Sequence, residues 1–163
     1  MARILLVGCG CRGQRLAASL AGEGHAVRGT TRSPDRLAAI AAVGAEAVLA
    51  DPDRLGPLLP ALEGVRVVCW LLGSARGEPE AVAALHGPRL GSLLEKVVDT
   101  PGRGMVYEAA GTLPAEVLEG GVTIARRAAL TYRMSVRVVD RRPEEQSDWL
   151  TAARGAVDAV LTG

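Results

Sequence analysis

Six short apolar runs of strand length alternate along this chain with segments that carry apolar residues at helical spacing. This alternation is typical of a parallel sheet whose strands are connected by helices. The fourth run includes the unbroken apolar sequence Val67-Val68-Cys69-Trp70-Leu71-Leu72, which predicts a central strand covered on both faces. We predict one α/β domain over residues 1–163, with strands at residues 3–7, 26–31, 45–50, 65–72, 104–109 and 134–139.

Three of the expected helices carry informative patterns. One has a single apolar stripe at spacings i, i+3, i+4, i+7 and i+8, formed by Leu90, Leu93, Leu94, Val97 and Val98. The last helix is expected over residues 144–161, with Trp149 facing the core. Gly120-Gly121 lies in a helical segment at residues 114–132. Because each glycine costs a helix about 1 kcal/mol relative to alanine, this pair predicts a break.

A glycine-rich turn follows the first predicted strand. It reads Gly8-Cys9-Gly10-Cys11-Arg12-Gly13 and opens a helical pattern. Strand, G-x-G-x-x-G turn and helix in this order are typical of dinucleotide sites, where the helix N–H groups face a pyrophosphate. A purely structural tight turn is the alternative, and Arg12 could equally face solvent. The residues predicted to bind nucleotide are Gly8, Gly10, Cys11, Arg12 and Gly13.

The end of the second predicted strand indicates which dinucleotide is bound. NAD-selective sites place a carboxylate about 20 residues beyond the glycine turn, where it accepts hydrogen bonds from ribose hydroxyls. This chain reads Thr30-Thr31-Arg32-Ser33 instead, and Arg32 lies 19 residues past Gly13. A guanidinium with hydroxyl neighbours suits a 2′-phosphate. Thr31 and Arg32 therefore favour NADP over NAD, unless Arg32 is a solvated residue at the entry to the next helix.

The alternation predicts a three-layer, doubly wound, Rossmann-like parallel sheet of order 3-2-1-4-5-6. In such a sheet the ligand crevice lies at the carboxyl ends of strands 1 and 4, where the winding direction reverses. We expect Asp51, residues 73–77 and residues 110–112 to approach this crevice, with Gly73 among the residues that bind the cofactor.

The segments Leu5-Leu6-Val7-Gly8-Cys9-Gly10-Cys11-Arg12-Gly13 and Gly24-His25-Ala26-Val27-Arg28-Gly29-Thr30-Thr31-Arg32 resemble atypical short-chain dehydrogenase/reductase and NAD-dependent epimerase-like proteins. The resemblance covers about the first 50 residues. It implies a cofactor fold in which Asp51 approaches the adenine edge. The same pattern resembles the cofactor domains of ketopantoate-reductase-like and 6-phosphogluconate-dehydrogenase-like enzymes, which add a large helical domain.

Active members of the short-chain family use a Tyr-x-x-x-Lys pair, and this chain departs from that pattern. Tyr107 is followed four positions later by Gly111, Tyr132 by Val136, and the sole lysine is Lys96. The family's catalytic residues therefore cannot be carried over. The polar residues expected nearest the crevice are Glu108, Tyr107, His86 and Arg76, and the first three are the catalytic candidates, each with a structural role as its alternative.

Charge and cysteine content limit the partners. Nineteen basic and 18 acidic residues give a net charge of +1, which argues against nucleic-acid and membrane-surface binding. The three cysteines fit reduced thiols in a cytoplasmic protein better than disulfides, and no complete zinc set is evident, so no metal is expected. Cys11 could be sensitive to oxidation, because it begins a helix. We expect a small-molecule substrate or none, and a homodimer.

Two functions follow from these observations. The first is an NADP(H)-dependent oxidoreductase or epimerase-like enzyme that acts on a small molecule in the crevice. The second is a non-catalytic NADP(H)-binding sensor or regulatory subunit, which is consistent with the missing tyrosine and lysine pair. The sequence does not decide between them, because fold alone does not determine function.

Overall fold

A six-stranded parallel sheet of order β3-β2-β1-β4-β5-β6 organises the protein, as seen in a computed structural model that describes residues 1–102, 104–141 and 146–163. The predicted strand order is confirmed. The sheet reverses its winding direction between β1 and β4, whose carboxyl ends therefore border the crevice that this topology creates. The strands are β1 (Arg3–Val7), β2 (Ala26–Thr31), β3 (Glu46–Leu49), β4 (Val67–Trp70), β5 (Gly104–Glu108) and β6 (Ser135–Val139).

The first two strands have the predicted bounds, and the other four are shorter than predicted. The difference is largest at β4, whose predicted apolar run extends beyond Trp70 to Leu71 and Leu72. Both leucines are buried and line the crevice beyond the end of the strand, although the amide of Leu71 still donates a hydrogen bond of 2.9 Å to the carbonyl oxygen of Val7. Apolar character reports burial and not strand pairing, which explains why the sequence overestimates this strand.

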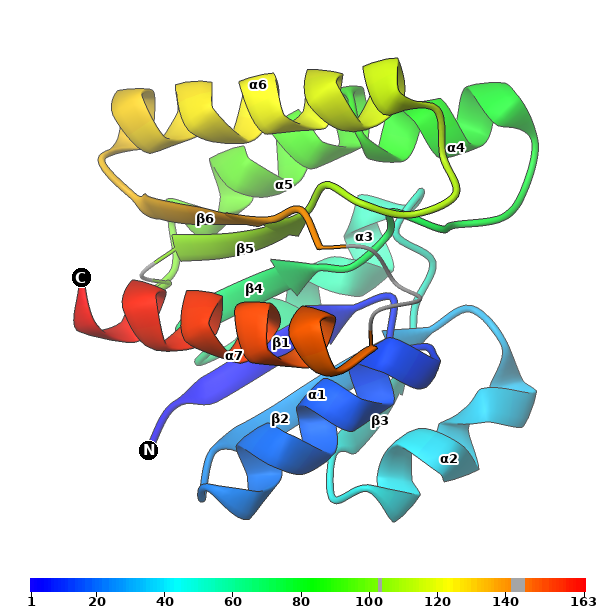
Figure 1. Cartoon of the computed structure of the whole chain (residues 1–163), viewed down its shortest axis with the longest axis vertical. Coiled ribbons are helices and arrows are strands. Elements are labelled where there is room, and N and C mark those ends of the chain that lie inside the picture. Colours follow the sequence, from blue (N-terminus) through cyan, green and yellow to red (C-terminus); the bar gives the residue numbers. More distant parts are fainter. Residues whose placement is uncertain (103, 142–145) are drawn as a thin grey trace.

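Helices cover both faces of the sheet (Figure 1). One face carries α1, α2 and α7, and the other carries α4, α5 and α6. No helix in the described part of the chain is both long and apolar enough to cross a bilayer. The helices are α1 (Cys11–Gly22), α2 (Leu37–Ala42), α3 (Leu55–Leu58), α4 (Pro79–Leu85), α5 (Pro88–Val97), α6 (Ala115–Tyr132) and α7 (Gln146–Thr162), with short 3₁₀ segments η1 (Pro34–Arg36) and η2 (Leu59–Leu62).

Two hydrophobic layers hold the helices on the sheet. On one side, Ile4 and Leu6 of β1 pack with Leu16 and Leu20 of α1 and with Trp149 of α7. On the other side, the alternate strand residues pack against α3, η2, α5 and α6. All four residues of β4 are buried, as expected for the central strand of a sheet that is covered on both faces.

Two helix expectations need correction. The apolar stripe of α5 ends at Val97, because Val98 is exposed. The helix that contains Gly120-Gly121 is continuous, so the predicted break is wrong. A Cβ on Gly121 would overlap the hydroxyl of Tyr107, so glycine lets α6 lie close to β5. The final helix is described from Gln146, and the predicted start at residue 144 lies outside the described residues.

Candidate functional site

The glycine turn between β1 and α1 forms the floor of the crevice. Gly8 has φ +88°, and a Cβ there would lie 2.6 Å from the carbonyl oxygen of Leu71, so only glycine fits. A Cβ on Gly13 would lie 3.3 Å from the carbonyl oxygen of Gly8, which reflects close helix–strand packing. Above Gly10 the space is open, and the nearest atom to a Cβ there is Nη1 of Arg36 at 3.9 Å. A phosphate can therefore approach the backbone at Gly10.

The first turn of α1 supplies donors for such a phosphate. Gly10 is the N-cap residue and has no side chain to cap the helix, and the first turn contains no acidic residue. The first intrahelical hydrogen bond runs from the amide of Gln14 to the carbonyl oxygen of Gly10, at 2.8 Å. The preceding N–H groups have no partner within the helix, and the positive end of the helix dipole favours an anion there.

Two arginines border the crevice at the carboxyl end of β2. Arg32 follows β2 directly, and Arg36 comes from the 3₁₀ segment that begins at Pro34. Arg36 is the one that approaches the glycine turn, whereas Nη2 of Arg32 donates a hydrogen bond of 2.9 Å to the carbonyl oxygen of Arg76. Sequence reasoning missed Arg36, although its position four residues after Arg32 was a usable signal.

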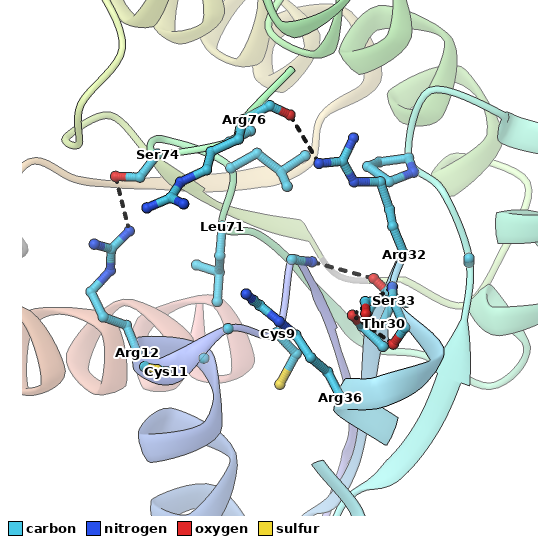
Figure 2. Close-up of a pocket in the computed structure, with 18 of the residues that line it drawn as sticks. Cys9, Cys11, Arg12, Thr30, Arg32, Ser33, Arg36, Leu71, Ser74 and Arg76 are labelled. Atoms are coloured by element: carbon cyan, nitrogen blue, oxygen red, sulfur yellow. Dashed lines mark hydrogen bonds between the residues drawn. The ribbon is translucent and has the colours of Figure 1, made fainter. Parts of the chain in front are cut away.

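The crevice has a volume of about 790 Å³ and a cationic lining. No aspartate or glutamate lines it among the described residues. Ion pairs in the described part of the chain engage Arg12 but not the other three arginines of the crevice. An anionic ligand would therefore meet positive charge on both sides (Figure 2). The arginines are Arg12, Arg32, Arg36 and Arg76.

Glu108 lies at the carboxyl end of β5, is fully buried, and does not line the crevice. Its Oε1 accepts a hydrogen bond of 2.8 Å from the amide of Gly73, and its Oε2 accepts one of 2.9 Å from the indole N–H of Trp149. Nη2 of Arg12 lies 3.2 Å from Oε2. Burial raises the pKa of Glu108, and Arg12 with the N–H donors opposes that shift. The carboxyl group thus connects the glycine turn, the loop after β4 and α7.

Arg12 is the link between this carboxyl group and the crevice. Its guanidinium lies 5.7 Å from the ring centroid of Trp149, and its Nη2 also lies 3.4 Å from Oγ of Ser74. Arg12 is half-buried and lines the crevice. The expectation that it could simply face solvent is therefore wrong.

His86 and Tyr107 form a second buried polar group, and neither lines the crevice. Nδ1 of His86 lies 2.5 Å from the Tyr107 hydroxyl, and its Nε2 lies 2.8 Å from the carbonyl oxygen of Leu72. Burial lowers the pKa of His86 and raises the pKa of Tyr107. Both groups are satisfied by protein partners in the layer beneath α6, so their geometry supports the structural alternative.

The remaining predicted residues occupy different positions. Thr31 lines the crevice, whereas Asp51 and Gly73 do not, although the residues on either side of each do. Oδ1 of Asp51 accepts a hydrogen bond of 2.9 Å from the amide of Asp53. Cys11 is exposed at the crevice, and burial raises the pKa of Cys9 to about 12. The described residues contain no cluster suited to a metal ion.

Neither protein-family models nor curated proteins gave a significant match to the chain. Solved structures with the same fold do exist. A short-chain dehydrogenase/reductase superfamily protein from Agrobacterium tumefaciens with bound NAD matches with a TM-score of 0.71 and 19% identity, over 85% of this chain and 48% of that chain. UDP-glucuronic acid 4-epimerase from Bacillus cereus in complex with NAD matches with a TM-score of 0.68 and 15% identity, over 86% and 56% of the two chains.

Vestitone reductase from alfalfa matches with a TM-score of 0.64 and 14% identity, over 86% of this chain and 56% of that chain. The chain thus spans about half the length of these three structures. At such identities the likeness concerns the fold alone. The resemblance predicted from the first 50 residues is confirmed at that level: this is a Rossmann-like domain whose structural neighbours are short-chain dehydrogenase/reductase and epimerase proteins.

Proposed function

We propose that the chain binds NADP(H) in the crevice between the glycine turn and the loops after β2 and β4. The observation that carries this proposal is the pairing of an open helix N-terminus at Gly10 with Arg32 and Arg36 at the end of β2. The pyrophosphate would accept hydrogen bonds from the first amides of α1, and the 2′-phosphate would lie between the two arginines. Two structural neighbours contain bound NAD, which supports a nicotinamide dinucleotide as the ligand class.

Two features support NADP rather than NAD. No carboxylate lines the crevice in the described part of the chain, so the adenosine ribose would lack its usual acidic acceptor there. Arg32 and Arg36 instead line the crevice beyond the end of β2, and planar guanidinium groups recognise phosphate with paired hydrogen bonds. Thr31 and Ser33 also line the crevice.

The experiment is a calorimetric titration with NADPH and with NADH. Arg32→Ala should raise the Kd for NADPH about 10- to 100-fold, because charged hydrogen bonds contribute about 1.5–3 kcal/mol each. The Kd for NADH should change less than about 3-fold, since that ligand has no 2′-phosphate. Gly10→Val should abolish binding of both while the circular dichroism spectrum stays unchanged, because a Cβ there meets no protein atom closer than Nη1 of Arg36 at 3.9 Å. Equal effects of Arg32→Ala on the two ligands would refute the 2′-phosphate assignment.

Between the two functions, the geometry of the side chains favours a binding protein that senses or reports NADP(H). Glu108, Tyr107 and His86 are buried and hydrogen-bonded outside the described lining of the crevice, which therefore holds no carboxylate, imidazole or phenol to transfer a proton. A bound nicotinamide would itself supply a hydride donor or acceptor. The enzymatic alternative, an oxidoreductase or epimerase-like activity, draws its support from the neighbours of the same fold.

Deuteride transfer distinguishes the sensor from an oxidoreductase. Protein incubated with 4-deuterated NADPH and a panel of carbonyl compounds, sugar nucleotides and flavins should release no deuterated product under the sensor proposal. Product that carries deuterium, absent with the Gly10→Val variant, would establish the enzymatic alternative instead. The Gly10→Val control matters because it removes cofactor binding and leaves the rest of the crevice in place.

A further inference from the structure

The loop that follows β4 forms part of the wall of the crevice. Ser74, Ala75 and Arg76 of this loop line it, opposite the glycine turn. Arg12 contacts Oγ of Ser74 at 3.4 Å, and Arg32 donates to the carbonyl oxygen of Arg76 at 2.9 Å. Arg12 and Arg32, which both line the crevice, therefore hold this loop in place (Figure 2).

The loop after β5 supports it from behind. The amide of Thr112 donates to Oγ of Ser74 at 3.1 Å, and the amide of Leu113 donates to the carbonyl oxygen of Gly73 at 3.2 Å. A Cβ on Gly73 would overlap the carbonyl oxygen of Ala110, so the two loops are in backbone contact. Hydrogen bonds from the arginines on one side and from the loop after β5 on the other thus hold residues 73–76 in position.

Arg76 has a charge that nothing in the described structure neutralises. Its side chain is exposed, and the ion pairs between described residues do not include it. Figure 2 shows this side chain running from the carbonyl that Arg32 contacts toward the side where Arg12 lies. Arg12 is different, because the buried carboxylate of Glu108 already balances its charge.

From this arrangement we infer that Arg76 binds the diphosphate of the dinucleotide from the side opposite α1, and that residues 73–77, held in place by the hydrogen bond from Arg32, cover the bound ligand. The inference rests on the proposed binding of a dinucleotide in this crevice. The first amides of α1 would hold the diphosphate from below, and Arg76 would neutralise its outward-facing oxygens. Arg32 would contact the 2′-phosphate and the Arg76 carbonyl together, so that the adenosine end of the ligand and the loop stabilise each other.

The test compares Arg76→Gln with a matched control, Arg66→Gln. Arg66 is also an exposed arginine, but it precedes β4 and therefore lies at the opposite end of that strand. Arg76→Gln should raise the Kd for NADPH about 10-fold, because one charge-assisted contact to phosphate is lost. Arg66→Gln should leave it within about 2-fold. In stopped-flow chase experiments the larger part of the Arg76→Gln effect should be a faster dissociation rate, since the loop covers the bound ligand.

Adenosine 2′-monophosphate, which has no diphosphate, separates the two roles. Its Kd should be unchanged by Arg76→Gln and raised by Arg32→Ala. If Arg76→Gln behaves like Arg66→Gln, or weakens adenosine 2′-monophosphate as much as NADPH, the assignment is wrong. If the unaltered protein binds NADH as tightly as NADPH, the 2′-phosphate proposal fails, and the diphosphate test is then made with NADH. Failure of the unaltered protein to bind either dinucleotide overturns the proposed function and this inference with it.

Discussion

The contact between Gly121 of α6 and Tyr107 of β5 allows a stability prediction with an internal control. A Cβ on Gly121 would overlap the hydroxyl oxygen and Cζ of Tyr107 and lie 3.0 Å from Cε1. A Cβ on Gly120, one residue earlier in the same helix, would meet no atom within 4 Å. Gly121→Ala and Gly120→Ala therefore make the same chemical change in two environments.

The expected free energies of unfolding follow from these contacts. In both variants alanine should favour the helix by about 1 kcal/mol relative to glycine. For Gly121→Ala, overpacking should cost about 2 kcal/mol, and displacing the Tyr107 hydroxyl from His86 should cost about 2 kcal/mol more. Gly120→Ala should thus be more stable than the unaltered protein by about 1 kcal/mol, and Gly121→Ala less stable by about 3 kcal/mol.

Urea denaturation followed by circular dichroism measures both differences. The corresponding melting temperatures should rise by about 3 °C for Gly120→Ala and fall by about 9 °C for Gly121→Ala, at about 3 °C per kcal/mol for a chain of this size. If Gly121→Ala proves as stable as Gly120→Ala, then α6 does not depend on close contact with Tyr107. In that case the structural role assigned to the Tyr107 and His86 pair would also lose its support.

Two further predictions concern the buried polar groups. Glu108→Gln should lower the free energy of unfolding by about 3 kcal/mol, the low end of the range for a broken buried ion pair, because the Arg12 side chain is 23% exposed. The control variant Asp53→Asn, which breaks the exposed pair with Arg89, should lower it by less than about 1 kcal/mol. Similar urea midpoints for the two variants would contradict this prediction. Because burial lowers the pKa of His86, the unfolded chain binds a proton below about pH 6.5 that the folded chain does not, so His86 destabilises the fold as the pH falls. The difference in free energy of unfolding between the unaltered protein and His86→Gln should therefore shrink by about 1 kcal/mol from pH 7.5 to 5.5. A constant difference would show that the pKa of His86 is the same in the folded and unfolded chains. The raised pKa of Glu108 changes stability with pH in the opposite sense, but it does so in both proteins.

The sheet and the glycine turn were predictable because their signals are local. A strand in this fold is a short apolar run, and the turn at Gly8 requires a positive φ that restricts the residue type. The spacing of strands and helices then leaves few topologies for a parallel sheet. The arginine after β2 was also visible, because it follows a strand whose end must border the crevice.

The partners of the polar side chains were not predictable from the sequence. Glu108, Arg12 and Trp149 are separated by up to 137 positions in the chain, and no periodicity connects them. Likewise, the sequence alone predicts that Gly121 breaks its helix. In the structure Gly121 lies against Tyr107 of β5, and α6 gains more free energy from this tertiary packing than the glycine costs it. Whether Arg36 and Arg76 line the crevice likewise depends on which loops meet there.

By itself the sequence therefore determined the doubly wound sheet, its strand order and the glycine turn, because each depends on local patterning and backbone sterics. Only the tertiary structure decided which polar groups face the crevice and which are buried with partners. His86, Tyr107 and Glu108 could have been site residues from their positions in the chain, and the fold instead satisfies their hydrogen bonds in its interior. The physical reason is that a side chain's environment is made by segments distant in sequence, which come together only when the sheet and its helices pack.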